Sequence, residues 1–274
     1  MLTIGELLKR TPPYLQERSV RSPKLDAEHL LAHVLGCKRL DLYVRFDQPV
    51  EPAEVELYRE LVRRRGQREP LAYLLGSWGF RGLDLACDAR ALIPRSETEL
   101  LVERGLARIA EIATPSVLDL GTGTGAIALA IKHERPEAQV TAVDISPDAL
   151  ALARENAERL QLDVELLEGD LFAPVTGRSF DLVLTNPPYV GTREEVDPEL
   201  ANEPALAIYA DSDGLAVIHR IVRDHPGGVL GVEIGSDQGA AVKQLLDAAG
   251  FERTGVEQDL NRRDRYVFGL RVSR

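Results

Sequence analysis

The sequence predicts an α/β protein in which a small N-terminal helical bundle and a β-hairpin precede a seven-stranded, doubly wound, mostly parallel sheet. Three observations predict this class. Apolar side chains in the first 76 residues have helical spacing, the chain after Pro115 alternates apolar strands with helices, and the first of these strands leads into a run of glycines at 121–125. We therefore expect domains at 1–76 and 96–274, joined by a linker at 77–95.

Length and composition are those of a soluble protein with two domains. The chain has 274 residues, of which 44% are hydrophobic and 28% charged. A formal net charge of −11 argues against nonspecific binding to a phosphate backbone. No apolar run approaches the ~20 residues of a membrane span and no secretory signal is visible, so we expect a cytoplasmic protein. Cys37 and Cys87 lack CxxC spacing, so we expect free thiols and no metal site.

Helices are predicted throughout residues 1–76. Thr3 and Glu6 fit a capping box at the start of the first helix, and Ser22 is a suitable N-cap for the second. A third helix is expected at about 52–65 and a short fourth from Pro70. The apolar side chains expected to face inward from the third helix are Leu57, Tyr58, Leu61 and Val62.

One basic cluster, Arg63-Arg64-Arg65 with Arg68, lies at the end of the third predicted helix. Cations are favourable at a helix C-terminus because they complement the macrodipole. We therefore expect a solvated helix end, with a contact to RNA or to an acidic partner as the alternative interpretation.

The linker has the pattern of a β-hairpin, because short alternating segments are separated by glycines. It leads into Leu92-Ile93-Pro94-Arg95. Ser96 and Glu99 then form the Ser-x-x-Glu pattern of a capping box, so Ser96 is expected to cap the next helix.

Strands and helices alternate in the second predicted domain. The predicted strands are 116–120, 139–143, 163–167, 180–185, 228–234, 250–257 and 265–271, and the predicted helices are about 97–112, 125–134, 147–160, 214–224 and 238–249. Near-continuous apolar strands separated by helices indicate a parallel sheet that is covered on both faces. The link from Gln258 to Asp264 is too short for a crossover helix, so the last two strands should be antiparallel. Six parallel strands with one inserted antiparallel strand is the arrangement of the Rossmann-like class I AdoMet-dependent methyltransferases.

A glycine-rich turn follows the first strand of this domain. It consists of Gly121, Thr122, Gly123, Thr124 and Gly125. Glycines let the backbone approach a ligand closely, and the helix that follows presents unpaired N–H groups. Asp144 ends the next strand, about 20 residues on, where a carboxylate holds the ribose hydroxyls of a nucleotide cofactor. These features alone fit either NAD or AdoMet.

Two further acids favour AdoMet over NAD. Asp119 lies just before the glycines, where it suits a cationic amino-acid ligand better than a pyrophosphate. Asp170 and Leu171 follow the third strand, where methyltransferases usually place an acidic loop around adenine. We therefore expect AdoMet as the methyl donor and S-adenosyl-L-homocysteine as its product.

The fourth strand ends in the tetrapeptide Asn186-Pro187-Pro188-Tyr189. Two prolines cannot continue a ladder, so the strand stops at the sheet edge where ligands bind in open α/β folds. The Asn186 side-chain oxygen and the Pro187 carbonyl can accept both N–H bonds of a planar amino or amide nitrogen, which orients a weak nucleophile and stabilises its developing positive charge. Tyr189 offers a face on which the planar group can stack.

The whole chain resembles the HemK/PrmC-type glutamine N5-methyltransferases. The resemblance is carried by residues 69–76, Leu92-Ile93-Pro94-Arg95 with Glu97-Thr98-Glu99, the turn from Asp119 to Gly125, Asn186 to Tyr189, and Glu233-Ile234-Gly235. It implies that the substrate is the glutamine of the Gly-Gly-Gln loop in class I peptide chain release factors. It also implies AdoMet binding by the glycine turn, Asp144, Leu171 and Asn186.

Two departures from the family pattern are visible. Ser96 stands where proline is usual, and Leu171 stands where relatives often carry an aromatic ring, so ring stacking on adenine is lost. The helical bundle is interpreted, from the resemblance, as the docking surface for the release factor.

Two other interpretations compete with this one. A DNA or RNA amino-methyltransferase would use the same tetrapeptide, but the acidic charge and the absence of an obvious base-reading domain argue against it. A nonenzymatic nucleotide-binding or NAD-dependent protein would explain the glycine turn and leave Asn186 to Tyr189 unexplained. We expect a monomer that acts on a protein, with no nucleic-acid substrate and no membrane contact.

Overall fold

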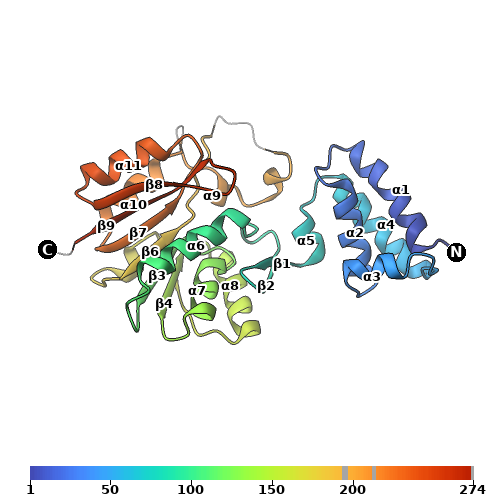
Figure 1. Ribbon diagram of the computed structural model, residues 1–274, viewed down its shortest axis with the longest axis horizontal. Helices are drawn as coiled ribbons and strands as arrows, with labels where there is room; N and C mark the ends of the chain where they lie inside the picture. The colour runs from blue at the N-terminus through green and yellow to red at the C-terminus, as the bar shows by residue number, and fades with distance from the viewer. Residues whose placement is uncertain (193–196, 212–213, 273–274) are drawn as a thin grey trace. The chain divides into compact units, whose positions relative to one another are not determined.

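The structure is a computed structural model and describes residues 1–192, 197–211 and 214–272 (Figure 1). The chain forms two compact units. The first comprises Met1–Ser77 with Val196–Asn202, and the second comprises Trp78–Glu195 with Glu203–Arg274. A short segment from the second half of the chain is therefore part of the N-terminal unit.

The first unit is a helical bundle. Its helices are α1 (Ile4–Gln16), α2 (Pro23–Val34), α3 (Arg39–Val44), α4 (Pro52–Gly66) and α5 (Leu71–Leu75), and a 3-10 turn, η2, covers Leu200–Asn202. The capping box at Thr3 is confirmed, because Thr3 Oγ1 accepts from Glu6 N at 3.2 Å and Glu6 Oε2 accepts from Thr3 N at 2.9 Å. Ser22 precedes α2, but its side chain makes no capping bond.

Two expectations about the bundle are wrong. Leu57 is 52% exposed, whereas the other three side chains of α4 that were predicted to face inward are buried. The buried face of α4 is therefore narrower than the set of its apolar residues suggests. Arg65 is 3% exposed, because its guanidinium binds Asp26 and Glu199 within the unit. Helix α3 was not anticipated from the sequence.

The second unit begins with a two-stranded hairpin and contains a seven-stranded sheet. The hairpin strands are β1 (Ser77–Phe80) and β2 (Leu83–Ala86). The sheet strands are β3 (Ser116–Leu120), β4 (Gln139–Asp144), β5 (Glu165–Glu168), β6 (Leu182–Thr185), β7 (Gly228–Glu233), β8 (Glu252–Gln258) and β9 (Asp264–Arg271). Their order is β5-β4-β3-β6-β7-β9-β8, with β9 antiparallel to both neighbours. The predicted α/β class and the antiparallel final pair are confirmed.

Helices cover both faces of this sheet. They are α6 (Ser96–Arg108), α7 (Ala126–Glu134), α8 (Pro147–Leu160), α10 (Ala216–Asp224) and α11 (Gly239–Ala248), with a short α9 at Ala205–Ile208 and a 3-10 turn, η1, at Ala173–Val175. Side chains alternate between the two faces, so Val117 packs in the cluster beneath α6 and α7 whereas Leu118 packs in the cluster beneath α10 and α11.

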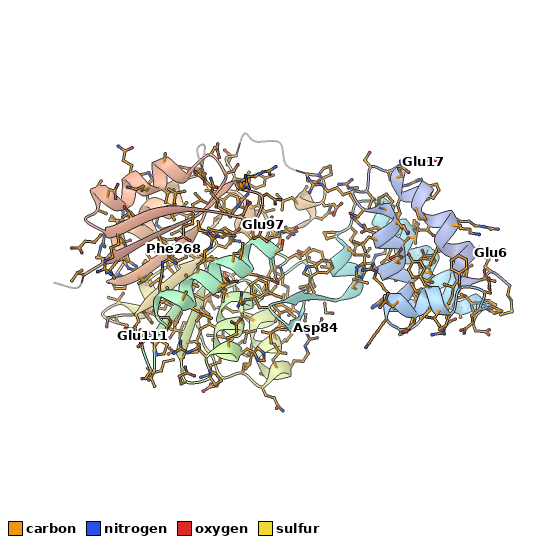
Figure 2. The ribbon with its side chains drawn as sticks, in the orientation of Figure 1. Glu6, Glu17, Asp84, Glu97, Glu111 and Phe268 are labelled. Atoms are coloured by element: carbon orange, nitrogen blue, oxygen red, sulfur yellow. The ribbon has the colours of Figure 1, made fainter. Side chains whose placement is uncertain are left out.

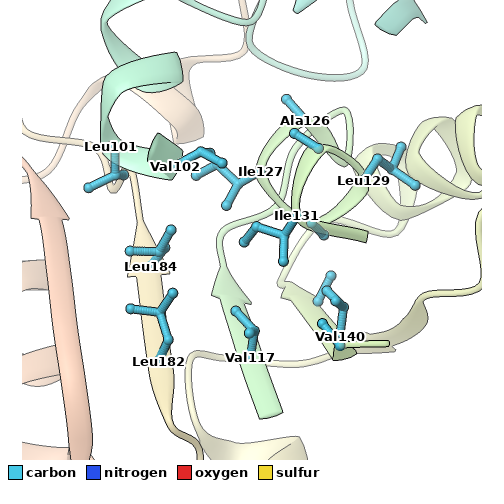
Figure 3. Packing of buried hydrophobic residues seen from close by; sticks show 14 of the residues in the cluster. Leu101, Val102, Val117, Ala126, Ile127, Leu129, Ile131, Val140, Leu182 and Leu184 are labelled. Atoms are coloured by element: carbon cyan, nitrogen blue, oxygen red, sulfur yellow. The ribbon is translucent and has the colours of Figure 1, made fainter. Parts of the chain in front are cut away.

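Helix α6 packs very closely on β6. Figure 3 shows Leu101 and Val102 of α6 beside Leu184, in the same cluster as the α7 side chains. Gly105 makes this approach possible, because a Cβ at that position would lie 2.9 Å from Leu184 Cδ1. The close contact fixes the height of α6 above the strand that carries the tetrapeptide.

The predicted capping role of Ser96 is wrong. Ser96 is the first residue of α6, Arg95 is the N-cap, and the Ser96 hydroxyl donates to Glu97 Oε2. Glu99 Oε1 instead accepts from the Arg81 backbone N–H at 3.0 Å. The start of α6 is held by tertiary contacts. One is a 2.6 Å hydrogen bond from Tyr266 Oη to the backbone carbonyl of Glu97, which is labelled in Figure 2.

Candidate active site

A cavity of about 260 Å³ lies at the carboxyl ends of β3, β4 and β6, where ligands bind in open α/β sheets. Ten of the predicted site residues line it: Gly121, Thr122, Gly123, Thr124, Asp144, Asp170, Leu171, Asn186, Pro187 and Pro188. Asp119, Gly125 and Tyr189 are not among its lining residues. Four segments that are far apart in the sequence thus meet at one cavity.

The glycine turn presents its backbone to the cavity. Gly121 has φ +70, and a Cβ built on it would meet no atom within 4 Å, so a side chain there would project into open space. The N–H groups of Gly121 and Thr122 both donate to the Val143 carbonyl, at 2.8 and 3.1 Å, which ties the turn to the end of β4. The shape is that of a backbone cradle for a ligand.

Asp144 forms one wall of this cradle. Its Oδ2 accepts from Gly123 N at 2.8 Å and its Oδ1 accepts from Ser146 N at 2.9 Å. Burial raises the pKa of Asp144, and the backbone donors oppose that rise. Because its orientation is fixed by two main-chain bonds, the carboxylate is preorganised at the cavity.

Asp119 lies beneath the turn and is completely buried. Its Oδ2 accepts from Thr122 Oγ1 at 2.6 Å and from Ala128 N at 3.1 Å, so the carboxylate supports both the turn and the start of α7. Its Oδ1 has no hydrogen-bond partner among the described residues, and burial raises the pKa of Asp119 to about 7. Direct contact between Asp119 and a cofactor stays a prediction.

The loop after β5 forms another part of the lining. Leu171 has φ +50, a left-handed conformation that is uncommon for a residue with a side chain. Asp170 Oδ2 accepts from Arg220 Nη2 of α10 at 2.6 Å, and Arg220 itself lines the cavity. Sequence analysis did not identify Arg220, because the pairing joins residues 50 positions apart.

The tetrapeptide is held at both ends. The Asn186 amide Nδ2 donates to Thr98 Oγ1 at 3.3 Å, and the Gln238 amide Nε2 donates to the Tyr189 carbonyl at 3.1 Å. Burial raises the pKa of Tyr189 to about 12. The stacking role of the Tyr189 ring stays a prediction, because the ring is not among the groups that line the cavity.

The segment before α6 also contributes to the cavity, although the sequence assigned it no role. Its lining residues include Ile93, Pro94 and Arg95. Glu203, whose side chain is 2% exposed, accepts from Ile93 N at 2.9 Å and from Arg95 Nη2 at 2.5 Å. The one available signal was an acid at the start of an otherwise apolar stretch, Glu203-Pro204-Ala205-Leu206-Ala207.

Within the parts of the chain that the structure describes, no cluster of three or more His, Cys, Asp or Glu residues is arranged to hold a metal ion. Over the same residues, every helix is too short or too polar to cross a membrane. The polar groups at the cavity are backbone N–H groups, carboxylates, a hydroxyl and an amide, which suit an organic ligand with hydroxyl and amino groups.

Comparison with family models gives two matches. Residues 6–76 match a family described as the PrmC N-terminal domain, and residues 96–204 match the methyltransferase small domain. The matches cover the helical bundle and the region from α6 to the segment that contains Glu203.

Comparison with curated proteins gives relatives over the full length. A release factor glutamine methyltransferase of Geobacter sulfurreducens is 43% identical, covering 97% of this chain and 96% of the relative. One from Deinococcus radiodurans is 40% identical over 99% of both chains. Among solved structures, the T. thermophilus 16S rRNA N2 G1207 methyltransferase, in complex with AdoMet and guanosine, has a TM-score of 0.51 at 20% identity, covering 71% of this chain and 49% of that one.

Proposed function

The chain belongs to the release factor glutamine methyltransferases, and we propose that it transfers a methyl group from AdoMet to the side-chain amide nitrogen of the glutamine in the Gly-Gly-Gln motif of class I peptide chain release factors. The observation that carries the proposal is a juxtaposition. The amide of Asn186 and the glycine turn with Asp144 line the same cavity. A methyl donor held by the turn would therefore lie beside the acceptor site.

The tetrapeptide provides the acceptor site. A glutamine amide nitrogen is a weak nucleophile, because its lone pair is delocalised into the carbonyl. Asn186 Oδ1 and the Pro187 carbonyl accept its two N–H bonds, which orients the nitrogen and stabilises positive charge as it develops. Pro188 lines the same wall, and Tyr189 closes the motif with a ring for stacking. Asn186 cannot take up a proton, so the proton leaves to solvent.

The donor set fits AdoMet. The open position over Gly121 accommodates a ligand main chain, and the Asp144 carboxylate is fixed where it can accept from ribose hydroxyls. The apolar side chain of Leu171 and the carboxylate of Asp170 flank the adenine end, and Asp119 supports the turn from below through Thr122. Thr122, Thr124 and Gly125 complete the turn. When bound, AdoMet supplies an electrophilic methyl group on a sulfonium ion.

The bundle serves as the docking surface for the release factor. Helix α3 exposes apolar side chains, since Leu40 is 78% and Val44 is 85% exposed. Exposed apolar residues close together on one short helix offer a contact surface to a protein substrate. In this assignment the domain roles are docking for 1–76, a linker for 77–95, and catalysis for 96–274.

Substitution on α3 tests this role in the full chain. Removal of the bundle is a poor test, because it would leave Asp197 and Glu199 without their bundle arginines. With Leu40→Ser and Val44→Ser together, we expect KM for intact release factor to rise while KM for a short Gly-Gly-Gln peptide is unchanged. If the KM for intact release factor is the same before and after substitution, α3 is not part of the docking surface.

The alternative, an exocyclic-amine methyltransferase of DNA or RNA, is not favoured by the relatives from Geobacter sulfurreducens, Deinococcus radiodurans and Xylella fastidiosa, which are each named for release factors. The decisive experiment incubates the enzyme with labelled AdoMet, intact release factor and, separately, DNA and RNA. Peptide mass mapping is expected to place the label on the glutamine of the Gly-Gly-Gln peptide. Label in nucleic acid, with none in that peptide, would overturn the proposal.

A further inference from the structure

Asn186 presents two chemically opposite groups, and its function in the proposed reaction requires one particular orientation. The amide oxygen accepts hydrogen bonds, whereas the amide nitrogen only donates. A glutamine N–H group can be received by Oδ1 but would be repelled by the Nδ2 hydrogens. A 180° flip of the amide would therefore destroy the acceptor while leaving the size of the side chain unchanged.

The neighbours of Asn186 specify that orientation. Nδ2 donates to Thr98 Oγ1 at 3.3 Å, and Thr98 Oγ1 donates to Glu233 Oε2 at 2.7 Å. A hydroxyl has a single hydrogen, and here that hydrogen is used on the glutamate. The Thr98 oxygen can then only accept from Asn186, so the amide must turn its NH₂ toward Thr98 and keep Oδ1 as the acceptor.

The three residues come from different elements that are held rigidly. Thr98 is in the first turn of α6, Glu233 ends β7, and Asn186 follows β6. Glu233 is 1% and Thr98 is 4% exposed, so water does not compete for their bond. The position of Thr98 is fixed by the bond from Tyr266 Oη to the Glu97 carbonyl and by the contact of Gly105 with Leu184.

The arginines near Glu233 form ion pairs with other acids, Arg95 with Glu203 and Arg265 with Asp259. Glu233 makes a hydrogen bond to Thr98, and the nearby charged groups are Arg265 of β9, Arg95 and Glu97. A carboxylate that is fully buried and bonded to a hydroxyl is costly for stability. A function for the hydrogen bond to Thr98 would explain why a buried glutamate occupies this position.

We infer that Thr98 and Glu233 are positioning residues for methyl transfer, which act through Asn186 by fixing the orientation of its amide. This inference rests on the proposed acceptor role of Asn186. It assigns a function to Thr98 and Glu233, which belong to two motifs, Glu97-Thr98-Glu99 and Glu233-Ile234-Gly235, to which the proposed function gives no role.

Thr98→Val and Thr98→Ser form the test pair. Valine has nearly the same shape as threonine but lacks the hydroxyl, and serine retains the hydroxyl. With intact release factor at pH 8.5, we expect Thr98→Val to lower kcat by about 10- to 100-fold, with the AdoMet Kd and the release factor KM changed less than about threefold. Thr98→Ser is expected to stay within about threefold of the wild-type kcat.

Thr141→Val is the matched control. Thr141 is also a buried threonine whose hydroxyl donates to a glutamate, Glu165, at 2.8 Å, but it is not among the residues that line the cavity. It should leave kcat within about twofold of wild type. If Thr98→Val does not fold, as judged by its thermal transition, Glu233→Gln replaces it, with an expected kcat loss of at least about threefold and unchanged AdoMet affinity.

Two results would overturn the inference. One is a kcat for Thr98→Val (or for its substitute, Glu233→Gln) within twofold of wild type, and the other is a Thr98→Ser variant as impaired as Thr98→Val. Failure of the proposed function is a different result, because the wild-type enzyme would then place no label on the Gly-Gly-Gln glutamine.

Discussion

The Gly123 backbone N–H donates to Asp144 Oδ2 at 2.8 Å, which joins the middle of the glycine turn to the end of β4. The turn and the carboxylate therefore hold each other in place before any ligand binds. Ser146 N occupies the other carboxylate oxygen at 2.9 Å. A ribose that binds here meets an acceptor whose direction is already fixed, so little ordering is needed on binding.

Replacement of Asp144 should affect the cofactor more than the fold. We expect Asp144→Ala to weaken AdoMet binding by about 10- to 100-fold, because hydrogen bonds to a charged acceptor are lost. Isothermal titration calorimetry measures this. Asp148→Ala, an exposed acid in the first turn of α8, is the control and should bind AdoMet normally. Equal affinities for the two variants would remove Asp144 from the cofactor site.

Replacement of Asn186 should affect chemistry more than cofactor binding. Loss of Oδ1 removes an acceptor that acts most strongly in the transition state, so Asn186→Ala is expected to lower turnover by about 100-fold or more. AdoMet affinity should be largely retained. Single-turnover assays with release factor, together with AdoMet titration, separate these effects, and Asn261→Ala at an exposed position is the control. Near-normal turnover would exclude the amide-acceptor mechanism.

Arg65 is the central ionic residue of the bundle. Its Nε binds Asp26 Oδ2 and its Nη2 binds Glu199 Oε1, both at 2.7 Å, with the side chain 3% exposed. Arg65→Ala would leave buried acid unpaired and is expected to destabilise the protein by about 3–5 kcal/mol. Arg63 is 52% exposed and paired with the exposed Glu60, so Arg63→Ala should destabilise the protein much less.

Urea denaturation of the full chain compares these two variants. The structure predicts a clear difference in midpoint, with Arg65→Ala unfolding at lower urea than Arg63→Ala. Indistinguishable midpoints would mean that the ion pairs of Arg65 contribute no more than an exposed pair.

Asp119 should make stability depend on pH in a definite direction. Burial raises the pKa of Asp119 from its ordinary value of 3.8 to about 7 in the folded state. Between these values the folded state binds more protons than the unfolded state, so this group stabilises the fold at low pH and the contribution is lost as pH rises through about 7.

Asp119→Asn tests this direction, because asparagine keeps an acceptor for Thr122 and Ala128 but cannot ionise. We expect the stability of the variant relative to wild type to be higher at pH 8 than at pH 5. Denaturant unfolding at the two pH values, without cofactor, measures it. A relative stability that does not rise between pH 5 and pH 8 would show that the pKa of Asp119 is not raised in the folded state.

Much of the site was predictable because its chemistry is local in the sequence. The glycine turn, Asp144 and the tetrapeptide each carry a signal within a few residues: backbone freedom, a carboxylate at a strand end, and two prolines that stop a ladder. Since parallel strands bring their carboxyl ends to one edge, the sequence also predicted that these signals meet, and ten predicted residues line one cavity.

Residues that depend on distant partners were missed or misjudged. Ser96 fits a local capping pattern, yet α6 begins one residue earlier than that pattern implies, because Tyr266 and Arg81 fix its first turn. Arg65 has the pattern of a solvated helix end, yet it is buried by a segment 134 positions further along the chain. Local propensity is a weak signal when tertiary contacts satisfy the same groups.

The sequence by itself determined the α/β class, the antiparallel pairing of the last two strands and the family to which the chain belongs. It could do so because periodicity, short links and motifs are properties of neighbouring residues. Only the tertiary structure decided that Thr98 and Glu233, 135 positions apart, meet beside Asn186. It also decided that Asp119 lies beneath the turn and Glu203 beside Arg95. These are long-range pairings of buried polar groups, and no local pattern specifies which acid will satisfy which donor.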